Sequence, residues 1–330
     1  MASDDLSVSR RTLMGAASAG LAASAMPAAA QSSGAGAVAK SDPTQAYPKP
    51  PFPAQRQPWP GLASKMNPRP DHGETSYKGS GRLKGRKALI TGGDSGMGRA
   101  AAIAFAREGA DVAINYLPEE EPDAREVVAL IRAEGRTAVA LPADIRSEEA
   151  CQRIVAGAVK GLGGLDILVS NAAKQEAQPT LDDIDNEQFD RTMKTNIYAM
   201  FWLTKAALKH MGPGSAIIVT ASEQAYDPSK DLVDYAMTKA AGVSFTKSMA
   251  KQLGPKGIRV NAVAPGPIWT PLQVSGGATQ EKLVQFGGST PLGRPGQPAE
   301  LGSIYVQLAD PMASYTTGHV YGAAGGSGQP

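Results

Sequence analysis

The sequence predicts an α/β fold, a doubly wound parallel sheet in a single domain that follows an N-terminal extended arm. Three observations predict this fold class. Short apolar runs without internal alternation are separated by segments with helical periodicity, which is typical of strands covered on both faces. A glycine-rich turn joins the first apolar run to the first helical segment. No second series of strand–helix units follows, so the 330 residues contain one such domain, over residues 82–330.

The predicted elements alternate along this domain. The first strand, residues 87–90, is a short apolar run, and the first helix, residues 99–108, ends at Gly109. Further strands are expected at residues 111–115, 137–141, 166–169, 216–220, 259–263 and, on a weaker pattern, 319–321. Further helices are expected at residues 123–134, 148–160, 187–210, 232–253 and 299–309. The alternation predicts parallel strands joined by helical crossovers.

Two segments precede the domain. Residues 1–30 contain Arg10 and Arg11, then an alanine-rich, weakly apolar run, and they resemble a bacterial twin-arginine export signal. This resemblance implies a periplasmic protein with no membrane span after processing. The alternative is a disordered alanine-rich tail on a cytoplasmic protein. Residues 31–81 hold nine prolines and predict an arm, which is either a flexible tether or a segment laid across the domain or a neighbouring subunit.

Composition excludes several kinds of partner and site. The net charge is +2 and no basic patch with interleaved aromatic residues is present, so nucleic acid is not an expected partner. Cys151 is the only cysteine, which excludes a disulfide framework and a cysteine-rich metal site. His72, His210 and His319 are far apart in the sequence, and none stands in a metal-ligand spacing. No metal site is therefore expected.

The glycine-rich turn lies between the first strand and the first helix. Its glycines let the backbone approach a pyrophosphate, and the free N–H groups and the dipole of the helix favour the negative charge. The turn therefore predicts a Rossmann-like dinucleotide site formed by Thr91, Gly92, Gly93, Asp94, Ser95, Gly96, Met97 and Gly98.

A tyrosine and a lysine lie four positions apart in a predicted helix. Tyr235 and Lys239 share one face of that helix. An ammonium group beside a phenol lowers the phenol pKa, and the pair is then a proton donor for a carbonyl group. The chain holds a second copy of this spacing, Tyr226 and Lys230. Pro228 lies inside that copy, and proline is poorly tolerated in a helix interior.

These features together resemble the short-chain dehydrogenase/reductases. The glycine spacing of residues 92–98 is similar to that of the short subfamily. Members of the family carry a serine thirteen positions before the catalytic tyrosine. Ser222 stands there relative to Tyr235, whereas Pro213 stands there relative to Tyr226. The resemblance therefore selects Tyr235. The enoyl reductases of this fold use a longer spacing from tyrosine to lysine and fit less well.

Further family motifs match over about residues 82–325. The resemblance implies a catalytic tetrad of Asn196, Ser222, Tyr235 and Lys239. Besides the glycine turn, it implies cofactor contacts at Asn115, Tyr116, Asp144, Ile145, Asn171, Ala172, Tyr235, Lys239, Pro265, Gly266, Ile268 and Thr270. The chain looks most like bacterial stress-associated, glucose-dehydrogenase-like members with a proline-rich N-terminal arm, and the family implies a homotetramer.

The resemblance implies an NAD(P)-dependent oxidoreductase that moves a hydride between nicotinamide and an alcohol or carbonyl substrate, which is an aldehyde, a ketone or a sugar. Tyr235 would give or take the proton, and Lys239 would lower its pKa and hold the nicotinamide ribose. Ser222 would stabilise charge on the substrate oxygen, and Asn196 would hold a water that links Lys239 to solvent. The competing hypotheses are a non-catalytic nucleotide-binding sensor and an exported interaction protein that works through its arm.

The sequence favours NAD over NADP without excluding either cofactor. The end of the second strand, residues 114–117, holds neither an acid nor a basic residue, but Glu119, Glu120 and Glu121 nearby would repel a 2′-phosphate. A substrate loop is expected at residues 271–298, with a short helix at residues 280–286. The residues expected in the substrate pocket are Ser222, Gln224, Tyr235, Trp269 and Gln273.

Overall fold

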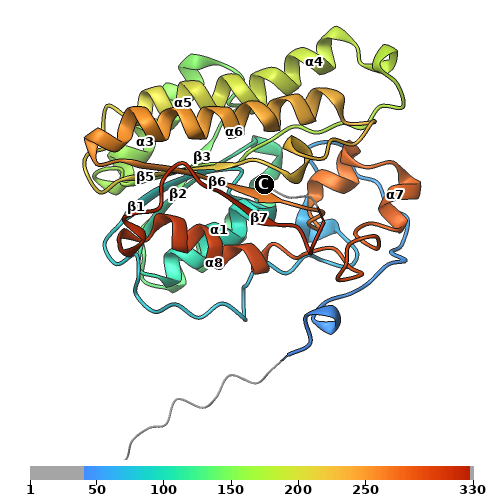
Figure 1. The fold of residues 1–330 in the computed structure, drawn as a ribbon. Helices are drawn as coiled ribbons and strands as arrows, with labels where there is room; N and C mark the ends of the chain where they lie inside the picture. The colour runs from blue at the N-terminus through green and yellow to red at the C-terminus, as the bar shows by residue number, and fades with distance from the viewer. Residues whose placement is uncertain (1–40, 328–330) are drawn as a thin grey trace, which may run out of the picture. The chain divides into compact units, whose positions relative to one another are not determined.

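The computed structural model describes residues 41–327, so the predicted export signal at residues 1–30 lies outside the described residues. The domain is built on a seven-stranded parallel sheet with the order β3-β2-β1-β4-β5-β6-β7 (Figure 1). Its strands are β1 (Lys87–Thr91), β2 (Asp111–Tyr116), β3 (Ala138–Pro142), β4 (Ile167–Ser170), β5 (Ala216–Thr220), β6 (Arg259–Pro265) and β7 (Val320–Ala323). All seven predicted strands are present, and their bounds differ from the prediction by at most two residues.

The helices are α1 (Gly96–Arg107), α2 (Glu121–Ala133), α3 (Glu148–Leu162), α4 (Asn186–Met193), α5 (Ala199–Ala207), α6 (Val233–Leu253), α7 (Gln280–Val284) and α8 (Ala299–Ala309). α1 begins three residues earlier than predicted, because the glycine turn leads directly into it. The single helix predicted at residues 187–210 is instead α4 and α5, joined by a π-helical turn at Lys194–Tyr198.

The sheet separates two hydrophobic cores. Successive residues of a strand point to opposite faces. Ile90 of β1 therefore belongs to the core under α1, α2 and α8, while Leu89 belongs to the core under α3, α5 and α6. Figure 1 shows α1 and α8 on one side of the sheet and α3, α5 and α6 on the other. Both faces of the strands are buried, which explains why the apolar runs lack alternation.

Strand order reverses between β1 and β4. β1 pairs in parallel with β2 on one side and with β4 on the other. At such a point the chain leaves the two neighbouring strands toward opposite faces of the sheet, and a crevice opens at their carboxyl ends. The glycine turn follows β1 at this edge, and the segment after β4 lies across from it.

The described part of the arm, residues 41–81, packs against the domain of its own chain. Phe52 is buried and stacks on Trp269, with ring centres 4.4 Å apart. Arg107 of α1 donates hydrogen bonds to three backbone carbonyl oxygens of the arm. Within residues 41–327 the arm is therefore a packed segment and not a tether. In the same residues, no helix has the length and apolar character that crossing a membrane requires.

Candidate active site

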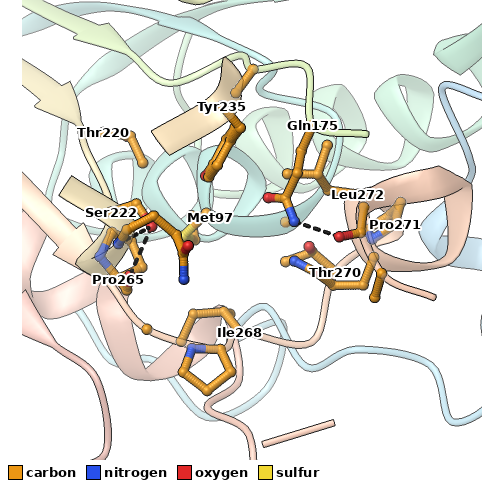
Figure 2. Close-up of a pocket in the computed structure, with 18 of the residues that line it drawn as sticks. Met97, Gln175, Thr220, Ser222, Tyr235, Pro265, Ile268, Thr270, Pro271 and Leu272 are labelled. Atoms are coloured by element: carbon orange, nitrogen blue, oxygen red, sulfur yellow. Dashed lines mark hydrogen bonds between the residues drawn. The ribbon is translucent and has the colours of Figure 1, made fainter. Parts of the chain in front are cut away.

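A cavity of about 1110 Å³ opens at the carboxyl ends of the strands. Its walls come from the glycine turn, the segments after β4, β5 and β6, the start of α6 and the substrate loop, residues 271–298. Figure 2 shows Tyr235, Ser222 and Gln175 around one part of this space. The fold thus brings segments that are far apart in the sequence to a single site.

The glycine turn requires glycine for steric reasons. Gly92 has a φ of 62°, a left-handed conformation that residues with a side chain rarely adopt. A Cβ atom on Gly98 would lie 1.9 Å from the Gly92 carbonyl oxygen, and one on Gly93 would lie 2.5 Å from Ile114. The residues of the turn that line the cavity are Gly92, Asp94, Ser95, Gly96 and Met97, whereas Thr91, Gly93 and Gly98 support it from behind.

Asn171, which follows β4, holds the glycine turn in place. Its side-chain nitrogen donates to the backbone oxygens of Thr91 and Gly92, at 3.0 and 3.2 Å. In return, the Thr91 hydroxyl accepts hydrogen bonds from the backbone N–H groups of Asn171 and Ala172. Asn171 and Ala172 both line the cavity, and Asn171 also sets the shape of the turn.

Tyr235 and Lys239 lie on one face of α6, and both side chains are buried. Lys239 Nζ donates to the backbone oxygen of Thr220 at 2.7 Å and lies 5.3 Å from the centre of the Tyr235 ring. Burial lowers the pKa of Lys239 to about 8. Burial also raises the pKa of Tyr235, and a hydrogen bond with Ser222 lowers it to a smaller extent. Both groups are therefore shifted toward their neutral forms.

The sequence predicts that Lys239 lowers the pKa of Tyr235, whereas the pKa of Tyr235 in this structure stands above its usual value. Burial has the largest influence on the pKa of both side chains, and it disfavours the phenolate as well as the ammonium. The ammonium group is also directed to the carbonyl oxygen of Thr220. Thr220 was not predicted as a site residue, although its position at the end of β5, two residues before Ser222, could have identified it.

Ser222 lines the cavity, and its hydroxyl group is held by hydrogen bonds to the backbone. Its hydroxyl oxygen accepts a hydrogen bond from the backbone N–H of Gln224 at 3.2 Å, and the hydroxyl donates to the Pro265 carbonyl at 3.5 Å. The residue lines the cavity next to Tyr235 (Figure 2). The turn after β5 therefore fixes the position of the serine hydroxyl.

Asn196 lies in the π-helical turn between α4 and α5, and its side chain has a structural use. The amide oxygen accepts from the backbone N–H of Lys174 at 2.8 Å. The amide nitrogen donates to the Lys174 carbonyl and to the Thr238 hydroxyl, each at 2.9 Å. Both amide hydrogens are used, and Asn196 does not line the cavity. A water held by this residue would have to bind its backbone or the remaining lone pair of Oδ1.

The end of the cavity near β2 and β3 contains the other predicted cofactor residues. The side-chain nitrogen of Asn115 donates to the carbonyl oxygens of Leu141 and Ala143, both at 2.9 Å, and so ties β2 to the end of β3. Burial acts to raise the pKa of Asp144, but hydrogen bonds from Arg146 outweigh it and hold that pKa below its usual value. The predicted residues that line this end are Asn115, Tyr116, Asp144 and Ile145.

Two carboxyl groups, Asp94 and Glu120, also line this end of the cavity. Asp94 is 1% exposed, and neither of its carboxyl oxygens has a hydrogen-bond partner among residues 41–327. Burial raises the pKa of Asp94 well above its usual value, although local contacts with its own backbone N–H and with the Ser95 side chain act in the opposite direction. Burial, followed by the charge of Asp94, raises the pKa of Glu120 well above its usual value. A buried carboxyl group without a partner is costly unless it is neutral or meets a donor from a ligand.

One residue that was predicted for the substrate end of the cavity does not lie there. Gln224 and Gln273 line the cavity, but Trp269 does not. Trp269 is wholly buried, and its indole nitrogen donates to the Pro68 carbonyl of the arm at 2.8 Å. The prediction that Trp269 belongs to the pocket is therefore wrong, because the arm covers this side chain. The predicted cofactor residues that do line this region are Pro265, Gly266, Ile268 and Thr270.

Sequence reasoning missed three polar residues of the substrate end. Gln175 lines the cavity, and its side-chain nitrogen donates to the Gly277 carbonyl of the substrate loop at 2.6 Å (Figure 2). Burial raises the pKa of Glu223 to about 7. Lys282 forms a 2.6 Å ion pair with Asp231. None of the three stands in a motif, although Glu223 directly follows the predicted Ser222.

Proteins similar to this chain include an oxidoreductase and a dehydrogenase. A family model described as "Enoyl-(Acyl carrier protein) reductase" matches residues 92–327. The chain is 56% identical over 285 residues to the uncharacterized oxidoreductase YghA of Escherichia coli, with 86% of this chain and 97% of that protein covered. It is 43% identical over 282 residues to the glucose and ribitol dehydrogenase of Daucus carota, with 84% and 97% covered.

Solved structures give a similar result. A short chain dehydrogenase from Burkholderia cenocepacia, in complex with NADP, has a TM-score of 0.69 and 35% identity, with 74% of this chain and 98% of that chain covered. A 3-ketoacyl-(acyl-carrier-protein) reductase from Brucella melitensis, complexed with NADH, has a TM-score of 0.67 and 32% identity, with 75% and 100% covered.

Proposed function

The chain belongs to the short-chain dehydrogenase/reductase family, and on this basis we propose that it is an NAD(P)-dependent oxidoreductase acting on an alcohol or carbonyl group. The observation that carries the proposal is that one cavity holds both the glycine turn and Tyr235, together with Ser222 and Lys239. The test is a substrate panel of D-glucose, ribitol and glyceraldehyde, followed at the nicotinamide absorbance with both cofactors. No turnover of any probe in either direction would count against the proposal.

The residues present fit a dinucleotide cofactor. The glycine turn leads into the N-terminus of α1, where backbone N–H groups without acceptors favour a pyrophosphate. The unpaired carboxyl oxygens of Asp94 can accept hydrogen bonds from ribose hydroxyl groups. When bound, the nicotinamide ring would supply or accept the hydride.

The side chains around Tyr235 suit proton transfer at a substrate oxygen. Burial raises the pKa of Tyr235, so its hydroxyl keeps its proton at neutral pH and can donate it during carbonyl reduction. Ser222 donates a hydrogen bond to the same oxygen and stabilises the charge that develops there. Lys239 uses one N–H for the Thr220 carbonyl and keeps two for the nicotinamide ribose and the phenol.

Carbonyl reduction is expected to lose rate above about pH 8. Burial lowers the pKa of Lys239 to about 8, so the ammonium is present below this pH and is lost above it. Burial raises the pKa of Tyr235, so this residue stays protonated over the same pH range and does not change the rate there. A log plot of kcat/KM against pH, which reports the groups of the free enzyme, should be flat near neutrality and should approach a slope of about −1 above pH 8.

A second titrating group has to be separated from Lys239. Glu223 lines the same cavity, and burial raises its pKa to about 7. A Glu223→Gln variant should remove any change of rate that occurs near pH 7. The loss of rate above pH 8 should remain in this variant. A reduction rate that stays constant, or rises, through pH 8 in both proteins would contradict the role given to Lys239.

We infer a preference for NAD over NADP from Asp94 and Glu120, which line the cavity beside the glycine turn. A 2′-phosphate near these groups would meet a negative charge, whereas a 2′-hydroxyl could donate to it. Because burial raises the pKa of Asp94 well above its usual value, the negative charge and the preference for NAD should grow as the pH rises from 6 to 8. Fluorescence titration with both cofactors measures it, and the isosteric Asp94→Asn variant should lose the pH dependence. Tighter binding of NADP at pH 8 would overturn this preference.

A polyhydroxylated substrate, a sugar or a polyol, is the class we propose within the alcohols and carbonyls. The substrate end of the cavity presents many hydrogen-bonding side chains, among them Gln175, Gln224 and Lys282. The similarity to a glucose and ribitol dehydrogenase supports the same class. In the substrate panel, a preference for an apolar ketone such as cyclohexanone over ribitol and D-glucose would refute it.

We also propose a homotetramer that is exported through the twin-arginine route with its cofactor already bound. Phe201 of α5 and Met237 of α6 are 51% and 52% exposed, and these helices share one face of the sheet (Figure 1). Exposed apolar side chains of this kind support a contact between subunits. A monomer mass by light scattering, or a processed enzyme free of nucleotide in a periplasmic fraction, would contradict the respective part of this proposal.

A further inference from the structure

The arm reaches the substrate end of the cavity that contains Tyr235. Lys49, Pro50, Trp59 and Pro60 line this cavity. Figure 1 shows the blue segment of the arm beside α7 of the substrate loop. Part of the cavity wall is therefore built from residues that precede the domain.

Two glutamine side chains hold the arm in a hairpin-like turn. The Gln57 amide accepts from the backbone N–H of Leu62 at 2.8 Å and donates to its carbonyl oxygen at 3.0 Å. Gln55 makes the equivalent pair of bonds to the backbone of Asn67. Each glutamine side chain thus makes the two hydrogen bonds across the turn that the backbone of a paired strand would otherwise make. The tip of the turn, which carries Trp59, is held in position without regular strand pairing.

Hydrogen bonds join this turn to the substrate loop at several points. The backbone N–H of Phe52 donates to the Val284 carbonyl at 2.8 Å. The backbone N–H of Gln57 donates to the Val274 carbonyl at 2.9 Å. The Gln280 side chain donates to the backbone of the arm at 3.0 Å. The arm is therefore bonded to both the beginning and the middle of the loop.

A small apolar cluster fastens the same two segments. Phe52 and Met66 of the arm pack with Trp269, Val274 and Leu283, separately from the two cores of the sheet. The stacked rings of Phe52 and Trp269 lie 4.4 Å apart. Burial of a side chain as large as phenylalanine stabilises a contact far more than an exposed loop contact does.

On its other side the substrate loop contacts the segment after β4. Gln175 bonds to the Gly277 carbonyl at 2.6 Å, and the backbone N–H of Ala177 bonds to the Gly276 carbonyl at 2.9 Å. Lys174 in this segment lies 5.0 Å from the centre of the Trp59 ring. The arm, the loop and the segment after β4 thus form one connected wall.

We propose that the arm is a specificity element of this enzyme: it supplies the outer wall of the substrate pocket and holds the substrate loop in position. The proposal rests on the proposed oxidoreductase function and adds that substrate affinity depends on the arm, while cofactor affinity does not. Loops of this kind cover the substrate and exclude water. Here the arm limits the movement of the loop from outside.

Trp59→Ala tests the part of the proposal that concerns the wall. Trp59 is 38% exposed, so its removal leaves no large cavity in a core. The variant is expected to raise KM for the probe that the wild type turns over, ribitol or D-glucose, by about tenfold. The cofactor Kd should stay within about twofold of the wild-type value. Lys65→Ala is the matched control, because Lys65 is an exposed arm residue outside the cavity.

Phe52→Ala tests the holding of the loop without reference to activity. Loss of the ring should speed hydrogen exchange across residues 273–287 and leave exchange in β4 and β5 unchanged. Phe52→Leu, which keeps most of the apolar volume, should give a smaller change and serves if the alanine variant fails to fold. Unchanged loop exchange in both variants, or an unchanged KM in Trp59→Ala, would overturn the proposal. If the wild type turns over no probe, the oxidoreductase function fails and loop exchange still decides whether the arm holds the loop.

Discussion

Replacing Tyr235 with phenylalanine is expected to lower kcat by about 10²–10⁴-fold, the usual contribution of a positioned general acid or base. The ring remains, so its packing in α6 remains as well. The glycine turn and Asn171 are untouched, and cofactor affinity should therefore be unchanged. Steady-state kinetics with the preferred probe and fluorescence titration of the cofactor measure the two effects separately.

Tyr226→Phe is the matched control for this experiment. It makes the same chemical change nine positions upstream, at a tyrosine that also has a lysine four residues further on. Tyr226 is 37% exposed and does not line the cavity, so kcat should not change. Undiminished kcat in Tyr235→Phe would refute the mechanism. Cofactor binding without turnover in the wild type would instead favour a nucleotide-binding sensor.

The fold was readable from the sequence because each element leaves a local signal. Strands that are buried on both faces are continuous apolar runs in the sequence. The alternation of strands and helices then allows few topologies. The π-helical turn at Lys194–Tyr198 is an example of what local signals omit. One extra residue in a turn barely changes the apolar periodicity, so residues 187–210 resembled one uninterrupted helix.

The candidate site was predicted where spacing along the chain determines geometry. Tyr235 and Lys239 are on the same face of α6 because they are four residues apart. The pKa of each group was not predictable, because it depends on burial by segments from elsewhere in the chain. The same is true of Asn196, whose amide bonds to the backbone of Lys174, 22 residues earlier.

The arm explains the largest error in the substrate pocket. Trp269 follows the predicted cofactor residue Ile268 and was expected beside the substrate. It is covered by Phe52, a residue more than 200 positions earlier, and no pattern near either residue indicates this contact. A proline-rich segment with little periodicity gives no sign that glutamine side chains will fold it into a turn. The sequence therefore allowed the arm to lie across the domain but did not identify which residues of the domain it would cover.

Replacing Gly98 with alanine is expected to have the second large effect, a loss of cofactor affinity of at least about 100-fold. The added Cβ would lie 1.9 Å from the Gly92 carbonyl oxygen and 2.7 Å from the side-chain nitrogen of Asn171. The Gly92 carbonyl oxygen belongs to the backbone, and the Asn171 side chain is held by its hydrogen bonds to the turn, so the backbone of the turn has to shift. Overpacking of this kind costs about 1–3 kcal/mol or more, and about 2.8 kcal/mol of lost binding corresponds to 100-fold.

The control for Gly98→Ala is Gly212→Ala. An added Cβ on Gly212 would meet no atom within 4 Å, and the residue is exposed, so cofactor Kd and Tm should stay at wild-type values. If Gly98→Ala lowers Tm by several degrees yet binds cofactor normally, the turn would be needed for folding and not for binding. Unchanged Kd and Tm would show that the turn can absorb the methyl group. A large loss of cofactor affinity with a small change in Tm would instead show that the strain lies in the cofactor site. Gly92 and Asn171 belong to that site and are not part of the two hydrophobic cores.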